Sequence, residues 1–384
     1  MAGSRRSSLR RRGALALTAA GVALLLAEVA LRLVGFTYPN FRQPDSVRGW
    51  VLRPGAAAWS RSEGESFVRI NAEGMRDVER SPEKPAGAWR LAVLGDSMVE
   101  ALQVPLERTF TQLLERELAS CPALAGRAIE VLNFGVSGYG TAQELLTLRH
   151  QVWRFSPDAV MLGFFSGNDV ADNHRGLDGR QDRPYFELDA EGELRLDDAF
   201  RRSAAYRVRR ASGWFYVLVN RSRVLQLFKS AAVARRRRDS DAAGAEAGLD
   251  RSRLDAQEAW TVTEALLRRL HREAATGGAR FAVAALPTAE QVRPDAQERR
   301  RRQERLGMAD FDGPVRRLLA LGEREGFAVL ALARPLRAQS ERDGVFLHGF
   351  PNTVLGAGHL NASGHAAVAG ALAPWVCERL ANGG

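Results

Sequence analysis

Apolar runs and polar breaks alternate along most of the chain in a strand-then-helix rhythm. Short continuous apolar runs that end at glycine or polar residues predict buried strands, and apolar positions at helical spacing predict helices between them. The predicted strands cover residues 90–94, 128–133, 158–165, 279–286 and 327–331. The predicted helices cover residues 98–118, 141–155, 257–275, 314–325 and 364–381, with a break in the first at Pro105. This alternation predicts a three-layer α/β/α sandwich around a five-stranded parallel sheet.

A different apolar pattern stands at the N-terminus. Residues 13–27 contain no charge, and apolar character continues to residue 36 around Glu28 and Arg32. The segment from residue 13 to residue 36, about 24 residues, is long enough to cross a bilayer. Glu28 and Arg32 are expected to pair near the far interface. Because the arginine-rich tail of residues 1–12 precedes the span, this tail is expected in the cytoplasm and the chain after the span outside. The alternative is a cleaved signal peptide, but no small-x-small cleavage site follows the apolar run cleanly.

Charge and cysteine content add little that is specific. Half of the net charge of +10 comes from five arginines within the first twelve residues, and four more arginines stand together at residues 235–238. A basic stripe interleaved with aromatic residues is absent, so no nucleic-acid partner is expected. The two cysteines, Cys121 and Cys377, suit an oxidising compartment. Both lie near the end of a predicted helix, so they either pair or are two unrelated buried thiols.

Candidate chemistry stands at the carboxyl end of the first predicted strand. Gly95, Asp96 and Ser97 form the turn from that strand into a helix, where open α/β sheets hold their ligands. A hydroxyl at this point lies beside the unpaired N–H groups of the helix, which suits it to face developing negative charge. Ser97 is therefore the candidate nucleophile. The alternative is that Asp96 or Ser97 only caps the helix.

This turn and three later blocks of residues, taken in chain order, carry a resemblance to a known family. The blocks are Gly95-Asp96-Ser97, Asn133 with Gly138, Gly167-Asn168-Asp169, and His359 with Asn361. Together they resemble the four sequence blocks of the SGNH (GDSL-type) hydrolases, over residues 89–169 and 257–380. The resemblance implies a flavodoxin-like arrangement of the sheet and a serine hydrolase site.

The resemblance also implies a role for each matching residue. Ser97 would be the nucleophile, and His359 the general base that takes the serine proton and returns it to the leaving group. The Ser97 N–H, the Gly138 N–H and the Asn168 amide would form the oxyanion hole. For Asn168 the alternative is an Asx turn after the strand. His365 is expected to be structural, and no metal or cofactor is expected.

The chain departs from the family pattern at one position. Family members usually carry an Asp three residues before the catalytic His, and Gly356 stands there instead. The second imidazole nitrogen then needs another acceptor to fix its tautomer. The candidates are a backbone carbonyl of residues 356–358, Asn352, or a carboxylate from elsewhere such as Asp343. The departure is compatible with a Ser-His dyad, a relocated acid or a weakened enzyme.

Two regions lie outside the resemblance. Residues 37–88 are rich in Pro, Gly and Ser, and are interpreted as a stalk that packs on the catalytic domain and spaces it from the membrane. The hydrolase-like domain is placed at residues 89–384, with an insertion at residues 170–257. Within the insertion the pattern predicts a hairpin at residues 185–196 and a helical stretch at residues 214–228. A mobile loop is predicted at residues 231–248. The insertion is either a lid or substrate-facing surface, or a small core of its own.

Three functions are compatible with these residues. The first is a membrane-anchored extracytoplasmic (periplasmic) serine esterase that removes an acyl group, with acetyl one candidate, from a glycan, lipid or small ester. The second is transfer of an acyl group onto an exported polysaccharide, with envelope or export partners. The third is a catalytically weak domain that binds glycan or acts as a scaffold. Intact Ser97, Gly138, Asn168 and His359 favour the first two, and Gly356 favours the third.

Overall fold

The predicted strands form one parallel five-stranded sheet. The computed structural model describes residues 2–246 and 249–381. The strand order is β11-β10-β7-β5-β6, which places the first strand of the fold between the second and the third. The strands are β5 (Trp89–Gly95), β6 (Ile129–Gly135), β7 (Ala159–Phe165), β10 (Arg280–Leu286) and β11 (Ala328–Ala331). This is the flavodoxin-like order, with the point where the strand order reverses beside β5, and it confirms the predicted fold class.

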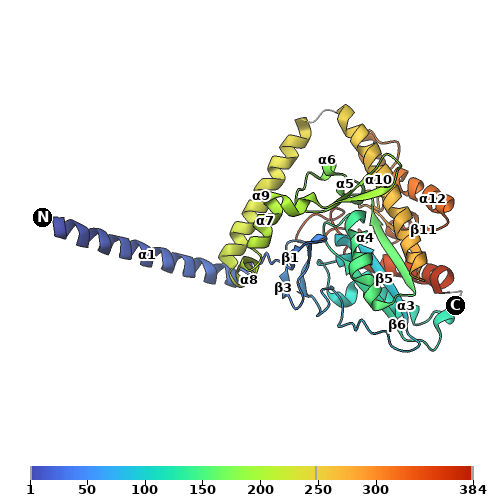
Figure 1. Cartoon of the computed structure of the whole chain (residues 1–384), viewed down its shortest axis with the longest axis horizontal. Helices are drawn as coiled ribbons and strands as arrows, with labels where there is room; N and C mark the ends of the chain where they lie inside the picture. The colour runs from blue at the N-terminus through green and yellow to red at the C-terminus, as the bar shows by residue number, and fades with distance from the viewer. Residues whose placement is uncertain (1, 247–248, 382–384) are drawn as a thin grey trace. The chain divides into compact units, whose positions relative to one another are not determined.

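Helices cover both faces of the sheet, as Figure 1 shows. Leu91 and Val93 of β5 face one side, where they join a core with α3 (Phe110–Leu118), α13 (Ala333–Asp343) and α14 (Ala362–Val376). Ala92 and Leu94 face the other side, where the core includes α4 (Thr141–His150), α10 (Leu249–Thr276) and α12 (Gly313–Glu325). The sheet is therefore buried on both faces, as its continuous apolar runs predict.

Several elements differ from the prediction. The first helix is split into α2 (Ser97–Glu100), a 3-10 turn and α3, and the break begins at Ala101, where φ is +55°, before Pro105. Outside the predicted insertion, the sequence pattern did not predict α11 (Ala296–Arg305) or α13. α11 is polar all round and so carries no apolar stripe, and α13 follows β11 directly. A π-helical turn at Cys377–Ala381 follows α14.

Cys121 and Cys377 form a disulfide, with their Cα atoms 5.6 Å apart. The bond joins the chain just after α3 to the end of α14. Of the two alternatives that the sequence leaves open, the structure has the paired one.

The chain divides into two compact units, and their boundaries differ from the predicted domains. One unit comprises Met1–Asn40 and Ser212–Glu246, and the other comprises Phe41–Ala211 and Ala247–Gly384. Residues 41–88 therefore belong to the same unit as the sheet, on which this segment was expected to pack. The predicted insertion is divided between the two units.

The start of the sheet unit consists of two antiparallel strand pairs. β1 (Arg42–Asp45) pairs with β2 (Gly49–Leu52), and β3 (Ala57–Ser60) pairs with β4 (Ser66–Arg69). Trp50, Leu52 and Val68 are buried in one cluster with Tyr139, which follows β6. The Tyr139 hydroxyl donates to the Trp50 carbonyl at 2.5 Å. Apolar packing thus holds this segment against the sheet.

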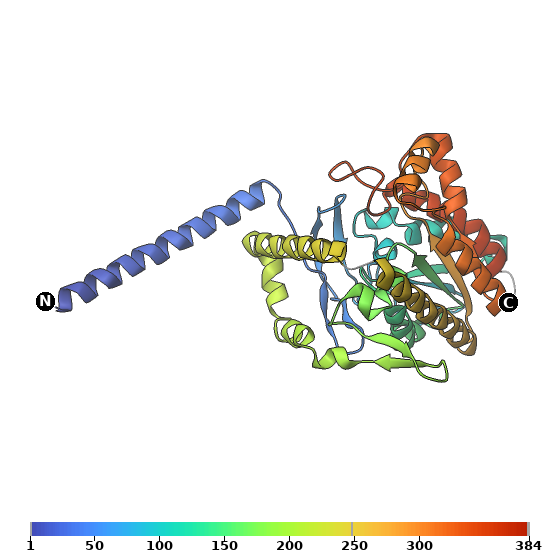
Figure 2. The same cartoon turned by 90° about the horizontal axis from the view of Figure 1, so that it is seen from above.

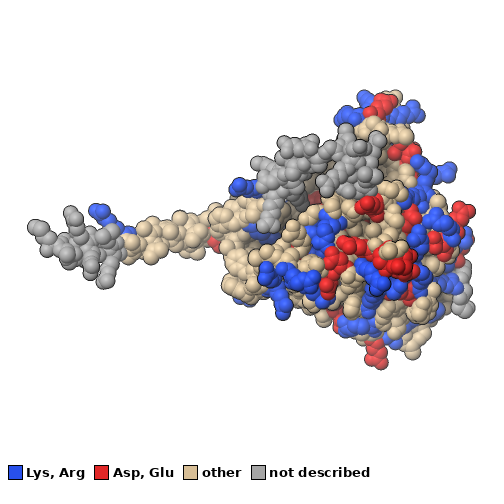
Figure 3. Space-filling view, turned by 45° about the horizontal axis from the view of Figure 1, so that its top comes forward, with Lys and Arg blue, Asp and Glu red and all other residues tan. Residues whose placement is uncertain are grey.

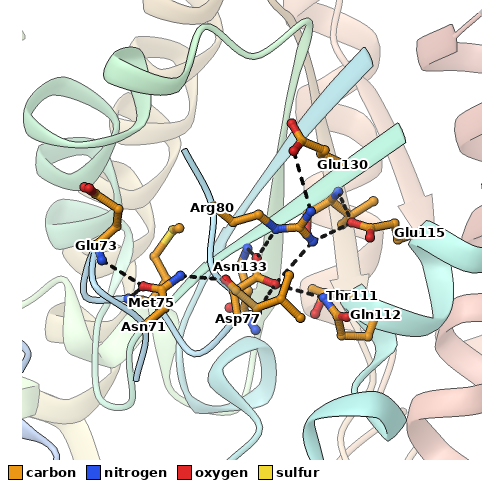
Figure 4. A network of polar contacts seen from close by, with 12 residues as sticks. Asn71, Glu73, Met75, Asp77, Arg80, Thr111, Gln112, Glu115, Glu130 and Asn133 are labelled. Carbon is orange, nitrogen blue, oxygen red and sulfur yellow. Dashed lines mark hydrogen bonds and ion pairs between the residues drawn. The ribbon is translucent and has the colours of Figure 1, made fainter. Parts of the chain in front are cut away.

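A polar network holds the end of the same segment, as Figure 4 shows. The buried Asp77 carboxylate accepts from the Asn133 backbone N–H at 3.1 Å and from Gln112 at 2.9 Å. Arg80 pairs with Asp77 at 3.3 Å and with Glu115 at 2.5 Å. Strand β6 and helix α3 are therefore both connected to residues 71–80.

The insertion contains helices and one hairpin. The predicted hairpin is present as β8 (Tyr185–Leu188) and β9 (Leu194–Asp197). The helices are α5 (Asp169–Asp172), α6 (Arg175–Asp178), α7 (Ala204–Ala211), α8 (Phe215–Arg221) and α9 (Arg223–Glu246). The loop predicted from residue 231 is wrong as far as Glu246, because this Ala- and Arg-rich stretch continues α9 with residues that favour helix. Residues 247–248 lie outside the described residues.

Helix α1 (Ala2–Leu33) runs without interruption in Figures 1 and 2. Its stretch Arg11–Leu33 is long and apolar enough to cross a membrane, and none of it is buried in the protein. Figure 3 shows the described part of α1 as uncharged along most of its length. Arg32 donates to Glu28 at 2.8 Å, as predicted from their spacing.

Candidate active site

Ser97 is the first residue of α2, just after the carboxyl end of β5, and β5 lies where the strand order of the sheet reverses. The Asp96 carboxylate accepts from the Met98 backbone N–H at 2.8 Å and caps α2. The Ser97 Oγ lies 2.9 Å from the Nε2 of His359. The capping role thus belongs to Asp96, and the half-buried Ser97 hydroxyl faces the imidazole.

A carboxylate that the sequence did not single out completes the site. The Nδ1 of His359 lies 2.5 Å from the Oε2 of Glu63, and the His359 backbone N–H donates to Oε1 at 2.8 Å. Glu63 stands between β3 and β4, 296 residues before His359. Ser97, His359 and Glu63 therefore form one continuous chain of hydrogen bonds.

His359 and Glu63 shift each other's pKa in opposite directions. Burial alone would lower the pKa of His359, but the hydrogen bond and charge of Glu63, together with Asp96 and Glu100, raise it above its ordinary value. Burial alone would raise the pKa of Glu63, but the hydrogen bonds and charge of His359 lower it. Glu63 is thus held as a carboxylate, and the imidazolium form of His359 is stabilised.

Glycine is required at two positions just before His359. Gly358 has a φ of +73°, and a side chain there would collide with the Glu63 carboxylate. Gly356 has a φ of +74°, and a Cβ there would lie 2.7 Å from the Phe346 ring and 2.9 Å from Arg293. The loop therefore has no room for the Asp that the family pattern places at residue 356, and Glu63 occupies the acid position from another segment.

None of the acceptors proposed from the sequence contacts His359 Nδ1. The Gly356 carbonyl accepts from Arg293 at 2.7 Å, and the Gly358 carbonyl lies 3.0 Å from His348 Nδ1. The Asp343 carboxylate pairs with Arg342 at 3.0 Å. A carboxylate from elsewhere in the chain does contact His359 Nδ1, but it is Glu63 and not Asp343.

Asn352 has a different position from the one proposed, beside the loop that carries Glu63. Its side-chain oxygen accepts from the Gly64 N–H at 2.9 Å. Its amide donates to the Gly64 carbonyl at 3.0 Å and to the Arg61 carbonyl at 3.2 Å. These three hydrogen bonds fix the backbone on either side of Glu63.

The two other predicted oxyanion donors lie on loops after β6 and β7. Gly138 has a φ of +76°, and its N–H has no protein acceptor in the described part of the chain. The Asn168 amide donates to Asp172 at 2.9 Å, and a further hydrogen bond connects Asn168 with Asp96, beside Ser97. The two N–H groups of the Asn168 amide thus have two carboxylate partners, Asp172 and Asp96, and the side chain lies beside Ser97.

The other residues singled out from the sequence have structural contacts. His365 is buried, stacks on Phe110 and accepts from the Phe110 N–H at 3.2 Å, and burial lowers its pKa to about 3. Asn133 donates to the Val99 carbonyl at 2.9 Å, and Asn361 caps α14. Among the described residues, no group of three or more His, Cys, Asp or Glu side chains is arranged to hold a metal ion.

Comparison with known proteins gives distant structural similarity. No protein-family model and no curated protein matches the chain. Among solved structures, TesA is 14% identical and covers 75% of this chain and 98% of its own, with a TM-score of 0.36. LAE5, an alpha/beta hydrolase enzyme from the metagenome of Lake Arreo, Spain, is 14% identical, with coverages of 78% and 99% and a TM-score of 0.39. Axe2, an acetylxylan esterase from Geobacillus stearothermophilus, is 14% identical, with coverages of 74% and 93% and a TM-score of 0.36.

Proposed function

We propose that the protein is a serine esterase of the SGNH type, which hydrolyses an acyl ester, with acetyl the first acyl group to test. The observation that carries this proposal is the chain of hydrogen bonds from Ser97 through His359 to Glu63, with distances of 2.9 Å and 2.5 Å. A neutral serine needs a base within hydrogen-bond reach, and the base needs a partner that fixes its tautomer. His359 and Glu63 are placed to meet both requirements.

In the proposed reaction the Ser97 Oγ attacks the ester carbonyl carbon while His359 Nε2 takes the hydroxyl proton. Glu63 keeps the other proton on Nδ1 and stabilises the imidazolium that forms. His359 then gives the proton to the leaving alkoxide, and the acyl group remains on Ser97. A water molecule, deprotonated by the same imidazole, attacks the acyl-enzyme and releases the acid and the free serine.

The oxyanion of each tetrahedral intermediate would be held by the Ser97 N–H, the Gly138 N–H and the Asn168 amide. Gly138 supports this role because its N–H has no acceptor in the described part of the protein. Asn168 supports this role because its amide, which donates to Asp172 at 2.9 Å, also bonds with Asp96 directly beside Ser97. Fixed donors of this kind stabilise developing charge without reorganising.

We further propose that α1 is an uncleaved anchor, with the N-terminus in the cytoplasm and the sheet unit in the periplasm. The support is a helix long and apolar enough to cross a membrane, preceded by arginines. The Cys121–Cys377 disulfide fits an oxidising compartment. The substrate would then be an ester of the cell envelope.

The proposal is tested by labelling the full chain in detergent with a fluorescent fluorophosphonate and by following hydrolysis of an activated acetyl ester. Labelling and turnover are expected for the natural sequence, and neither for Ser97→Ala or His359→Ala. A folded chain that neither labels nor turns over the ester would contradict the proposal. If glycan acceptors raise turnover and receive the acetyl label, the same site is a transferase rather than a hydrolase.

A further inference from the structure

The helices α8 and α9 meet at a junction that is tied to α1 by the Glu28 carboxylate. Glu28 accepts from the Ser222 hydroxyl and from the backbone N–H groups of Arg223 and Val224, each at 3.0 Å. Arg32, one turn further along α1, donates to Glu28 at 2.8 Å and to the Arg221 carbonyl at 2.7 Å. Glu28 thus caps the N-terminus of α9 from another helix, and the carboxylate is fully satisfied there.

The position of Glu28 along α1 sets the depth of this junction. With a rise of about 1.5 Å per residue, Glu28 lies about 24 Å and Arg32 about 30 Å along the axis from Arg12, the last arginine before the apolar stretch. The hydrocarbon core of a bilayer is about 30 Å thick. When Arg12 lies at the cytoplasmic face, the junction of α8 and α9 lies at the opposite interface.

Exposed apolar and aromatic side chains lie along α8, at the residue that precedes it and on the first turns of α9. Trp214 and Phe228 are 68% and 66% exposed, and Phe215, Leu218 and Leu227 are exposed as well. Tryptophan and phenylalanine at the headgroup level are typical of segments that lie in a membrane interface. In water this apolar surface would be unfavourable, whereas at the depth set by Glu28 it contacts acyl chains.

Basic residues accompany the apolar ones. Arg221 and Arg235 are exposed on α8 and α9. Lys229 donates to the Pro39 carbonyl at 3.0 Å and lies over the Tyr38 ring, so it also fixes the chain that leaves α1. A basic and aromatic helix pair suits a surface of anionic phospholipid.

From this geometry we infer that α8 and the start of α9 form an interfacial membrane-binding element, which lies in the extracytoplasmic leaflet beside the anchor. The occupant of the exposed apolar surface is phospholipid. This inference rests on the proposed uncleaved anchor and not on the esterase activity. The chain is then held at the membrane by three segments, α1, α8 and the start of α9, rather than by α1 alone.

The test uses the full chain in nanodiscs of phosphatidylglycerol and phosphatidylcholine, with one introduced cysteine carrying an environment-sensitive fluorophore. The two natural cysteines are bonded to each other, so the introduced thiol alone reacts. Trp214→Cys and Phe228→Cys are the test variants. Leu25→Cys reports insertion of α1, and Glu191→Cys, on the exposed turn of the β8–β9 hairpin, is the control outside this element.

Labels at residues 214 and 228 are expected to be quenched by lipids spin-labelled near the headgroup several-fold more than by aqueous iodide, with blue-shifted emission. The label at residue 191 should show the reverse. Iodide quenching without lipid quenching at 214 and 228 would overturn the inference, since the surface would then face water. Protection from both quenchers would also overturn it, since a second copy or another protein surface would then cover the helices.

The label at residue 25 distinguishes failure of the interfacial-element proposal from failure of the anchor proposal. Lipid quenching at residue 25 alone would leave the anchor in place and reject the interfacial element. Loss of lipid quenching at residue 25 as well would reject both. Thermal unfolding of each variant shows whether the substitution has disturbed the fold.

Discussion

Ser97 and Glu63 lie at the two ends of the same chain of hydrogen bonds, but they are held in different ways. Ser97 follows a seven-residue strand that is buried on both faces at the centre of the sheet. Glu63 stands in a loop between two four-residue antiparallel strands outside that sheet. The core fixes the first position, whereas hydrogen bonds from Asn352 and the close approach of Gly358 fix the second.

The difference teaches that the parts of one proposed catalytic site can have separate structural support. A change at the end of β5 acts on a position that the sheet enforces. A change in the Glu63 loop acts on a position that depends on a few local polar contacts, so it can move the acid without unfolding the sheet. The predictions below test this contrast.

The largest effect is expected at the position held by the sheet. Ser97→Ala should lower kcat for an activated acetyl ester by about 10⁵- to 10⁶-fold, because the nucleophile is lost. The melting temperature should stay close to that of the natural sequence, since Asp96 still caps α2. Turnover within tenfold of the natural rate would show that another residue is the nucleophile.

Glu63→Gln should lower kcat by about 10³- to 10⁴-fold, the size expected when an amide replaces a triad carboxylate and favours the wrong histidine tautomer. The matched control is Glu65→Gln, the same substitution two residues along the same segment, where the carboxylate pairs with Arg61 at 2.8 Å. The control should keep the natural rate. Equal losses in both variants would mean that the segment, and not the acid, matters.

Asn168→Ala should lower kcat by about 10²- to 10³-fold with a smaller change in KM, because one donor to the oxyanion is removed. Asn168 follows β7, so this variant extends the comparison to a second strand end of the sheet. Steady-state kinetics with the same acetyl ester measure the effect. An unchanged kcat would remove Asn168 from the oxyanion hole.

Asn352→Ala should lower kcat by about tenfold, because the loop loses hydrogen bonds of about 1 kcal/mol each and Glu63 becomes less well positioned. Thr353→Ala, at the next residue, is the control and should have no effect. A decrease in melting temperature with no change in kcat would show that Asn352 stabilises the fold without positioning the acid.

The smallest effect expected is a shift in pH dependence. His359 must be neutral to accept the Ser97 proton, and Glu63 contributes to raising its pKa above 6.5. The rate should therefore rise with pH through a midpoint above 6.5 in the natural sequence, and removal of the negative charge in Glu63→Gln should move that midpoint to lower pH. A profile of kcat/KM against pH measures both, and an identical midpoint in the two proteins would contradict the pairing.

The sheet, and two of the three residues in the hydrogen-bond chain, could be named from the sequence because their signals are local. A buried parallel strand is a continuous apolar run, and Ser97 and Asn168 come directly after such runs. His359 stands just before the final helix, where Asn361 caps it. These features are determined by neighbours in the sequence, so a pattern can report them.

Glu63 could not be predicted, because its role depends on contacts between distant segments. It lies among short strands with little periodicity, and nothing in residues 60–65 distinguishes it from Glu65. The absence of an Asp at residue 356 indicates that an acid is missing, but the crowding around Gly356 that excludes it exists only in the folded chain. In a similar way, α9 continues through residues that looked patternless because Ala and Arg favour helix without an apolar stripe.

The distance between Glu63 and the rest of the site along the chain also has a consequence for proteolysis. Residues 81–87, largely exposed, connect the Glu63 segment to the first strand of the sheet. Hydrolysis of one peptide bond in this connection would leave Glu63 on a different fragment from Ser97 and His359. The activity of the nicked protein would then depend on the non-covalent contacts that join the two fragments, such as those of Trp50 with Tyr139, Asp77 with Asn133 and Gly64 with Asn352.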